Sequence, residues 1–377
     1  MRVLHCPTTV GGNPQGLSRH LRQLGVESTS LTLLQNVYAY PADQVVWSPG
    51  DGLLARELKR LLAIARAARG FDVIHFNFGT TLADPLPATQ PVAGVLKRPL
   101  RALRARYANA LQRVELEVYR ALGKRMFVHY QGDDARQGDY CVAHFEHTTA
   151  TRVPPGYYSP ESDAFKRRSI RRMARFCEQI YALNPDLLHV LPEGSKFLPY
   201  SHLALDEWTP VWNQGEARPL RIAHAPTHRA FKGTARVLAA LEELRAEGYD
   251  FELILVEGIS NAEAKRRYAT ADVLVDQLYA GWYGGVALEA MALGKPVLCY
   301  LRQDDLRFIP EAMRAELPVL SVSERTIKQG LRQVLDMPRE ELLGWARRSR
   351  AFVERWHDPL KIAAQVKADY ERSLNRP

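Results

Sequence analysis

Short apolar runs alternate with longer amphipathic segments along most of this 377-residue chain. Short runs predict buried strands, and segments with apolar residues every three or four positions predict helices. The expected strands are Arg2–Cys6, Asp72–Phe76, Arg125–Tyr130, Gln179–Leu183, Leu220–Ala225, Phe251–Val256, Val273–Asp276 and Pro296–Tyr300. The expected helices are Gly16–Leu24, Leu53–Arg69, Val92–Leu122, Ser159–Phe176, Thr234–Glu247, Asn261–Thr270, Gly285–Leu293 and Glu340–Arg355. This alternation is typical of doubly wound α/β domains.

The pattern divides the chain into two parts. A polar stretch with prolines and a glycine, Thr209–Pro219, precedes the strand Leu220–Ala225, where the alternation begins again. The chain is also too long for one ordinary hydrophobic core and suits two domains of about 100–200 residues each. We therefore predict domains at residues 1–205 and 206–355.

The composition is that of a globular protein, with 46% hydrophobic and 25% charged residues. No apolar run approaches the roughly 18 residues that cross a membrane, and the first residues resemble a strand rather than a signal peptide. The four cysteines are far apart and form no C-x-x-C pair. We therefore expect a cytoplasmic protein with reduced thiols.

Positive charge is concentrated in the first half of the chain. Residues 1–205 contain 26 basic and 17 acidic side chains, whereas residues 206–377 contain 25 of each. The runs Lys97–Arg106 and Lys166–Arg175 contribute most of the excess. They are either solvated helix faces or a surface that attracts anionic lipid headgroups or a pyrophosphate-linked acceptor. We expect no nucleic-acid partner, because no RRM, zinc-finger or helix-turn-helix motif occurs.

A glycine-rich turn at Ala280–Gly285 leads into a predicted helix. The first amides of a helix have no partner within it, so we expect unpaired N–H groups at Tyr283, Gly284 and Gly285 that can bind a phosphate. Glu289 follows one to two turns later, within reach of a ribose.

A second loop, Ala223–Thr234, follows the first strand of the second half. Ligands in such sheets bind beyond the carboxyl ends of the strands. Arg229 and Lys232 would therefore add two positive charges to a phosphate site.

The loop after the first strand of the chain contains Gly11, Gly12 and Gly16. These glycines let the backbone approach a ligand closely and lead into a helix that we expect to begin at Gly16. Their spacing fits a G-x-G-x-x-G dinucleotide motif poorly, so we do not expect NAD.

Polar side chains also follow the strand Arg125–Tyr130. His129, Asp133, Asp134 and Arg136 lie within eight residues at this strand end. Such a set at one strand end is not expected to serve packing alone, although an ordinary loop with an Asp134–Arg136 pair explains the last two equally well.

These motifs resemble the retaining glycosyltransferases of family 4, which have the GT-B fold of two Rossmann-like domains facing a central cleft. The stretch Gly281–Val297 resembles their donor motif, roughly E-G-F-G-x-x-x-x-E-A-M-A-x-G-x-P-V, but has Gly281 in place of the first glutamate. The resemblance implies an acceptor-side domain at 1–205, a nucleotide-sugar domain at 206–355, and a C-terminal helix at 356–377 that crosses back to the first domain.

The resemblance also implies roles for individual residues. Lys232 and Arg229 would clamp the donor diphosphate, Glu289 would bind the ribose, and His129 would lie beside the donor sugar. With Asp133, which would orient the acceptor hydroxyl, His129, Arg229 and Lys232 form the expected catalytic set. The expected donor-binding residues are Gly11, Gly12, Gly16, Arg229, Lys232, Glu257, Gly281, Trp282, Tyr283, Gly284, Gly285 and Glu289. The expected acceptor-binding residues are Asn13, Gln15, Asp134 and Arg136.

The implied activity is sugar transfer with retention from a nucleotide sugar to a glycan or lipid-linked glycan, in bacterial surface polysaccharide assembly. The enzyme would be cytoplasmic or peripheral on the inner face of the membrane. No D-x-D motif occurs, so we expect neither a metal nor another cofactor, and positive side chains would stabilise the leaving diphosphate. A zinc cluster at Cys141, His144, Glu146 and His147 lacks a completing motif.

Two alternatives remain open. One is a nucleotide-sugar epimerase of the same architecture. The other is a non-catalytic module that binds a nucleotide sugar or a glycan, which the glycine at position 281 allows.

Overall fold

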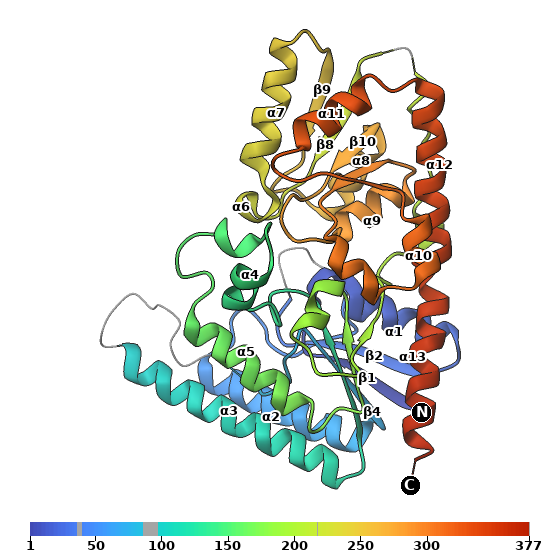
Figure 1. Cartoon of the computed structure of the whole chain (residues 1–377). Coiled ribbons are helices and arrows are strands. Elements are labelled where there is room, and N and C mark those ends of the chain that lie inside the picture. The colour runs from blue at the N-terminus through green and yellow to red at the C-terminus, as the bar shows by residue number, and fades with distance from the viewer. Residues whose placement is uncertain (36–39, 86–96, 217, 377) are drawn as a thin grey trace. The chain divides into compact units, whose positions relative to one another are not determined.

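The computed structural model describes residues 1–35, 40–85, 97–216 and 218–376. The chain forms two compact units (Figure 1). The first consists of Met1–Tyr140, Tyr158–His202 and Pro359–Pro377, and the second of Cys141–Tyr157 and Leu203–Asp358. The C-terminal helix therefore belongs to the first unit, and the segment Cys141–Tyr157 belongs to the second.

The first unit contains a seven-stranded parallel sheet in the order β3-β2-β1-β4-β5-β6-β7. Its strands are β1 (Arg2–Cys6), β2 (Glu27–Thr32), β3 (Gln44–Val45), β4 (Val73–Asn77), β5 (Arg125–Tyr130), β6 (Gln179–Ala182) and β7 (Lys196–Phe197). Its helices are α1 (Asn13–Gln23), α2 (Leu53–Gly70), α3 (Lys97–Ala121), α5 (Pro160–Met173) and α13 (Pro359–Leu374), and α4 (Gly138–His144) crosses the boundary at residue 140.

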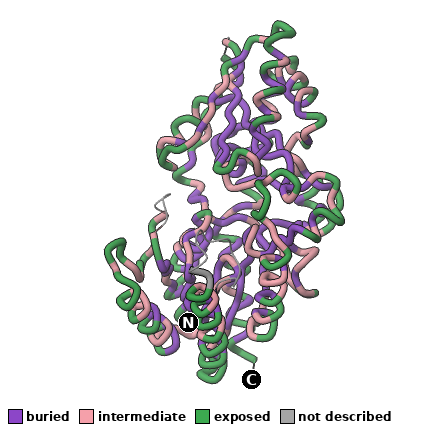
Figure 2. Tube along the Cα trace, turned by 90° about the vertical axis from the view of Figure 1, so that its left-hand side faces the viewer, coloured by how far each residue is buried: buried purple, intermediate pink, exposed green. Residues whose placement is uncertain are grey.

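Helices cover both faces of this sheet, because successive side chains of a strand point to opposite faces. On β5, Val128 packs in the cluster formed with α2, α3 and α5, whereas its neighbour Phe127 packs with α1 and α13. The helix α13 lies along α1 in this second layer (Figure 1). Buried residues concentrate along the strands, and exposed residues along the outer helices (Figure 2).

The second unit contains a five-stranded parallel sheet in the order β12-β11-β10-β8-β9. Its strands are β8 (Leu220–His224), β9 (Phe251–Leu255), β10 (Val273–Val275), β11 (Val297–Cys299) and β12 (Val319–Ser321). Its helices are α6 (Arg229–Lys232), α7 (Thr234–Ala246), α8 (Asn261–Thr270), α9 (Gly285–Ala292), α10 (Glu311–Glu316), α11 (Ile327–Leu335) and α12 (Arg339–Trp356). The helices α7 and α11 pack together, and α12 packs on α9.

Several elements differ from the sequence-based expectations. The strand β2 was missed because Glu27–Thr32 is largely polar, although five of its six residues are at least half-buried. The helix α1 begins at Asn13, so the expected start at Gly16 is wrong. The first residues of the expected helix Val92–Leu122 lie outside the described part of the chain, and α3 begins at Lys97. No helix in the described ranges is both long and apolar enough to cross a membrane.

Candidate functional site

Parallel pairing brings two predicted loops of the second unit together. Strand β10 pairs with β8, and Val275 lies opposite His224 at the carboxyl ends of the two strands. The loop after β8 forms the short helix α6, and the loop after β10 leads through the glycine turn to α9. Lys232 and the glycine turn, 48 or more residues apart in sequence, therefore meet at one edge of the sheet.

Asp276 links the two loops. Its Oδ1 lies 2.5 Å from the Nζ of Lys232, and its Oδ2 accepts a hydrogen bond of 2.7 Å from the backbone N–H of Gly284. Both side chains of this ion pair are buried, Lys232 at 9% exposure and Asp276 at 1%. The expectation that the Gly284 amide is unpaired is therefore wrong. In this structure the carboxylate of Asp276 occupies the position at which the Gly284 amide and the Lys232 ammonium group converge.

Position 281 is crowded by Arg302. Gly281 has φ +84°, and a Cβ atom there would lie 2.5 Å from the Nη1 of Arg302. The guanidinium is held by Asp305 at 2.7 Å and by the carbonyl oxygen of His147 at 3.0 Å, and it stacks on the ring of Phe145. A glutamate therefore does not fit at position 281 without moving Arg302.

Arg302 also lines a cavity of about 470 Å³ within the second unit. Its other walls come from the segments 144–147, 300–304 and 321–326, which contribute His147, Tyr300 and Ser323 among others. The guanidinium of Arg302 thus lies beside Gly281 and also forms part of the wall of this cavity.

The aromatic residues of the glycine turn belong to the hydrophobic core. Trp282 and Tyr283 are fully buried, and the Tyr283 hydroxyl is 2.7 Å from the Nε2 of His357. Any contact of these two residues with a donor would therefore come from their backbone. Gly285 is the first residue of α9, next to the paired Gly284 amide.

Arg229 and Glu257 form an ion pair at the surface. The guanidinium donates to both carboxylate oxygens, at 2.8 and 2.5 Å, and the Arg229 side chain is 58% exposed. His228, the residue before α6, caps this helix by accepting the Phe231 N–H on its Nδ1. Arg229 thus lies in the same short helix as Lys232. Its positive charge is paired with the carboxylate of Glu257, which the sequence analysis assigned to the donor site.

Glu289 is buried on α9, close to the start of α8. Its Oε1 accepts a hydrogen bond of 3.2 Å from the Nδ2 of Asn261, and burial raises the pKa of the carboxyl to about 7. A carboxyl with this pKa is partly protonated near neutral pH and can accept or donate a hydrogen bond. This chemistry suits a partner with hydroxyl groups.

In the first unit, the loop after β1 forms a turn with two left-handed residues, Gly11 and Gly12. Gly16 lies inside α1, where a Cβ atom would come within 2.6 Å of the backbone of Ser201 and His202. The absence of a side chain at position 16 thus permits close packing of α1 and does not mark the start of the helix.

Two side chains at the start of α1 have unusual surroundings. The Nδ2 of Asn13 and both amide atoms of Gln15 are buried without a hydrogen-bond partner among the described residues, although the Asn13 Oδ1 accepts from Ser201. Native proteins leave few buried polar atoms unpaired, so these amides mark a place where a ligand or water can bind.

His129 lies in a row of buried histidines on one face of the sheet. His5 and His75 stack at 4.9 Å between ring centroids, and His129 is 6.1 Å from His75. Burial lowers the pKa of His129 to about 3, and its Nε2 has no partner among the described residues. The ring is therefore neutral at physiological pH, and it can share a hydrogen bond but does not act as a cation.

The other polar residues after β5 bind partners within the first unit. Asp134 accepts the backbone N–H groups of Gln131 and Gly132, while burial raises the pKa of its carboxyl to about 7. Arg136 pairs with Asp186 at 2.6 Å, and Asp133 accepts a hydrogen bond from Tyr158. The expected Asp134–Arg136 pair is thus replaced by separate contacts that shape the loop.

Two further residues, Asp276 and Arg302, complete this neighbourhood. Asp276 follows a buried strand directly, which is the signal that marks a strand-end carboxylate, whereas its ion pair is not visible in the sequence. Arg302 lies 21 residues from Gly281, and no local pattern connects the two. Among the described residues no group of three or more His, Cys, Asp or Glu is placed to hold a metal ion.

The sequence matches no protein-family model, and no curated protein matches it. Solved structures do resemble the chain. Sucrose-phosphate synthase from Thermosynechococcus elongatus has a TM-score of 0.62 at 15% identity over 99% of both chains. The catalytic domain of Arabidopsis thaliana starch synthase IV, bound to ADP and acarbose, has a TM-score of 0.60 at 10% identity over 100% of both chains. HepE from Anabaena, in complex with UDP-glucose, has a TM-score of 0.59 at 10% identity, covering 98% of this chain and 99% of its own.

These similarities, together with two parallel sheets of seven and five strands, define the class of fold. The protein has the GT-B fold, as the sequence predicted. Sequence identities of 15% and below establish the fold only. The activity has to be inferred from the geometry of the site.

Proposed function

We propose that the protein is a retaining, metal-independent glycosyltransferase that uses a nucleotide sugar. The observation that carries this proposal is the convergence of Lys232 Nζ and the Gly284 N–H at the carboxyl ends of β8 and β10 in a GT-B fold. Ligands of such sheets bind at strand ends. The neighbouring structures named above contain UDP-glucose and ADP, which supports a nucleotide as the ligand here.

In this proposal the second unit binds the donor. When the glycosidic bond breaks, negative charge develops on the departing diphosphate, and preorganised positive groups lower the barrier. Lys232 and Arg229 would provide this charge without a metal ion. Because each of the two cations is paired with a carboxylate in this structure, the diphosphate would either share the cation with Asp276 or Glu257 or replace that carboxylate. Glu289 would bind the ribose hydroxyls.

The first unit would carry the acceptor. In a retaining reaction the acceptor hydroxyl attacks from the side of the leaving group, and the diphosphate oxygen can accept its proton. No protein nucleophile is then required. The neutral ring of His129 and the unpaired amides of Asn13 and Gln15 would contribute hydrogen bonds rather than charge.

Binding of nucleoside diphosphates tests this proposal directly. We expect UDP, ADP or GDP to raise the melting temperature of the protein, and we expect Lys232→Met to abolish that shift. Lys361→Met removes a lysine of α13 in the first unit and serves as the control. Incubation with the matching nucleotide sugar should then release its diphosphate slowly by hydrolysis. If no nucleoside diphosphate binds the wild-type protein, the proposal is wrong.

A non-catalytic module is the second candidate, because the groups expected to bind phosphate already have protein partners. Such a protein would bind the nucleotide sugar and leave it intact. Analysis of the donor after incubation separates the possibilities. Hydrolysis or transfer indicates a transferase, a changed sugar indicates an epimerase, and an unchanged bound sugar indicates a binding module.

We further propose a lipid-linked glycan acceptor and peripheral attachment to an anionic membrane surface, as in bacterial surface polysaccharide assembly. The support is an exposed apolar face on each of the helices α2 and α3, which lie side by side (Figure 1). Large apolar side chains of both helices are exposed to solvent, with Leu54 at 88% and Leu58 at 60% on α2. The others are Leu53, Leu61, Leu62, Leu100, Leu103, Val114 and Val118. Exposed apolar patches of this kind mark interaction sites, and the basic excess of the first half favours an anionic partner.

Sedimentation with vesicles tests the membrane proposal. We expect binding to vesicles that contain phosphatidylglycerol, with weaker binding to neutral phosphatidylcholine and at high salt. The triple variant Leu54→Gln, Leu58→Gln and Leu103→Gln should lose most of the binding. Leu360→Gln changes an exposed leucine on α13 of the same unit and should bind like the wild type. Equal binding by all variants would contradict the assignment of this face.

A further inference from the structure

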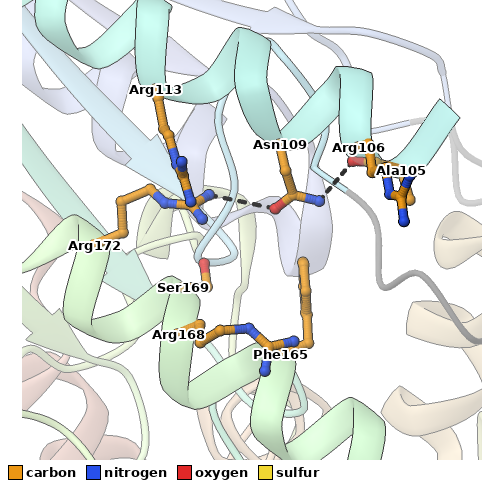
Figure 3. Close-up of a pocket in the computed structure, with 8 residues that line it drawn as sticks. All are labelled: Ala105, Arg106, Asn109, Arg113, Phe165, Arg168, Ser169 and Arg172. Carbon is orange, nitrogen blue, oxygen red and sulfur yellow. Dashed lines mark hydrogen bonds between the residues drawn. The ribbon is translucent and has the colours of Figure 1, made fainter. Parts of the chain in front are cut away.

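A cavity between α3 and α5 in the first unit is lined mainly by positive charge (Figure 3). Its volume is about 220 Å³. Two arginines come from each helix, and among the described residues no carboxylate lines the cavity. The lining residues are Arg106, Arg113, Arg168, Arg172, Ala105, Asn109, Phe165 and Ser169.

These arginines lack a negative partner. Within the described ranges, Arg106, Arg113 and Arg168 form no ion pair and no side-chain hydrogen bond. The residues outside those ranges include no aspartate or glutamate, so they cannot supply the missing charge. Like charges repel, so four unneutralised arginines around one cavity disfavour each other.

The effect of this repulsion is seen in the surroundings of Arg172. Its Nη1 donates to neutral side-chain oxygens, those of Asn109 at 3.3 Å and of Gln112, rather than to a carboxylate. Its partial burial, together with the charges of Arg113 and Arg168, lowers the pKa of the guanidinium. An anion in the cavity would relieve this repulsion.

The chemistry of the lining favours a phosphate group. Guanidinium groups bind phosphate oxygens through paired, charge-assisted hydrogen bonds. A phosphate monoester carries up to two negative charges and three acceptor oxygens, which several arginines can share. The cavity volume of about 220 Å³ is several times the roughly 30 Å³ that one water molecule occupies in the liquid, so a phosphate group has room to enter. Phe165 and Ala105 give it an apolar wall for part of an attached organic group.

We propose that this arginine cavity is a binding site for the phosphate group of a phosphate ester. It belongs to the first unit and shares no residue with the donor site proposed in the second. The phosphate can come from a soluble ester or from the headgroup of a lipid. Leu103 and Tyr107, on the same helix as Arg106, are exposed, so a lipid source is compatible with the apolar face of α3.

The test compares two double variants with the same change in charge. Arg113→Gln with Arg168→Gln removes one cavity arginine from each helix, and both side chains are exposed, so we expect the variant to fold. Arg104→Gln with Arg171→Gln removes exposed arginines of the same two helices that do not line the cavity. Calorimetry with glycerol 3-phosphate at low salt measures the soluble source, and sedimentation with phosphatidylglycerol vesicles measures the lipid source.

We expect the cavity variant to bind at least tenfold more weakly than the wild type, a loss of about 1.4 kcal/mol, while the control variant binds within twofold of the wild type. Loss with glycerol 3-phosphate identifies a soluble ester, and loss with vesicles alone identifies a headgroup. Equal losses in the two variants, or no binding of either probe by the wild type, would overturn the proposal. Binding of nucleoside diphosphates, measured in parallel, shows whether the donor site fails independently.

Discussion

The guanidinium of Arg302 occupies the space into which a side chain at position 281 would project, because a Cβ atom on Gly281 would lie 2.5 Å from its Nη1. This relationship explains the departure from the glycosyltransferase motif at this position. The backbone of Gly281 is also left-handed, a conformation that glycine adopts without strain. Glycine is therefore required here by both the fold and the neighbouring cation.

Replacing Gly281 should destabilise the second unit for both reasons. We expect Gly281→Ala to lower the free energy of unfolding by about 2–4 kcal/mol, since left-handed strain accounts for about 1–2 kcal/mol and displacement of a buried, paired arginine for the rest. Gly248→Ala is the matched control, because Gly248 has φ +94° with no atom near its missing Cβ. Urea denaturation measures both. Equal losses would mean that Arg302 moves aside without cost.

The ion pair between Lys232 and Asp276 should contribute to stability as a coupled unit. We expect Lys232→Met to lower the free energy of unfolding by about 3–5 kcal/mol, because it leaves a buried carboxylate without its cation. Adding Asp276→Asn should restore part of the loss, since the asparagine oxygen can still accept the Gly284 N–H. A double-mutant cycle in urea measures this coupling. Strictly additive losses would show that the two side chains do not interact in solution.

Glu289 should make stability depend on pH in a defined window. Its pKa is about 7 in the folded protein against 4.5 ordinarily, so the folded state holds a proton between these values that the unfolded state has lost. Stability contributed by this group therefore falls as the pH rises from 4.5 to 7. We expect Glu289→Gln to gain about 2–3 kcal/mol relative to the wild type across this window.

The same substitution should weaken nucleotide binding if the carboxyl holds the ribose. Stability and affinity would then change in opposite directions, which a packing defect does not produce. Glu242→Gln, at an exposed position of α7, controls for the loss of one charge. A stability difference that does not vary with pH would contradict the burial of a titrating carboxyl.

His129 should make the first unit sensitive to acid. Its pKa is about 3 in the folded protein against 6.5 ordinarily, so the unfolded state binds more protons below pH 6.5. Stability is therefore lost as the pH falls from 6.5 toward 3. We expect His129→Gln to reduce this loss and His144→Gln, at an exposed position, to leave it unchanged. Thermal melts from pH 7 to pH 4 measure the difference, and identical acid profiles would show that His129 titrates normally.

The carboxyl ends of the strands could be predicted because their signals are local. Lys232 and the glycine turn each follow an apolar run, and parallel sheets bring such ends together. The contacts of these residues could not be predicted in the same way. Nothing near Gly284 in the sequence indicates that its amide binds Asp276. A phosphate oxygen and a carboxylate oxygen can each accept a hydrogen bond from an unpaired N–H, and the local sequence does not indicate which of the two binds.

Helix boundaries and weak strands show the same limit. The sequence analysis predicted that a helix begins at Gly16, whereas in the structure Gly16 lies inside α1 and its missing side chain permits packing against Ser201 and His202. The polar strand β2 is held by its neighbours β1 and β3 rather than by its own hydrophobicity.

The sequence by itself determined the alternation of strands and helices, the two-part organisation of the chain and the positions of the polar loops. These features depend on the periodicity of apolar residues and on interactions between residues a few positions apart, and both can be read from a short stretch of sequence. Only the tertiary structure decided that Asp276 pairs with Lys232, that Arg302 fills the space beside Gly281, and that four arginines of α3 and α5 surround one cavity. Those contacts join residues that are distant in the chain, and packing alone fixes which charges become neighbours.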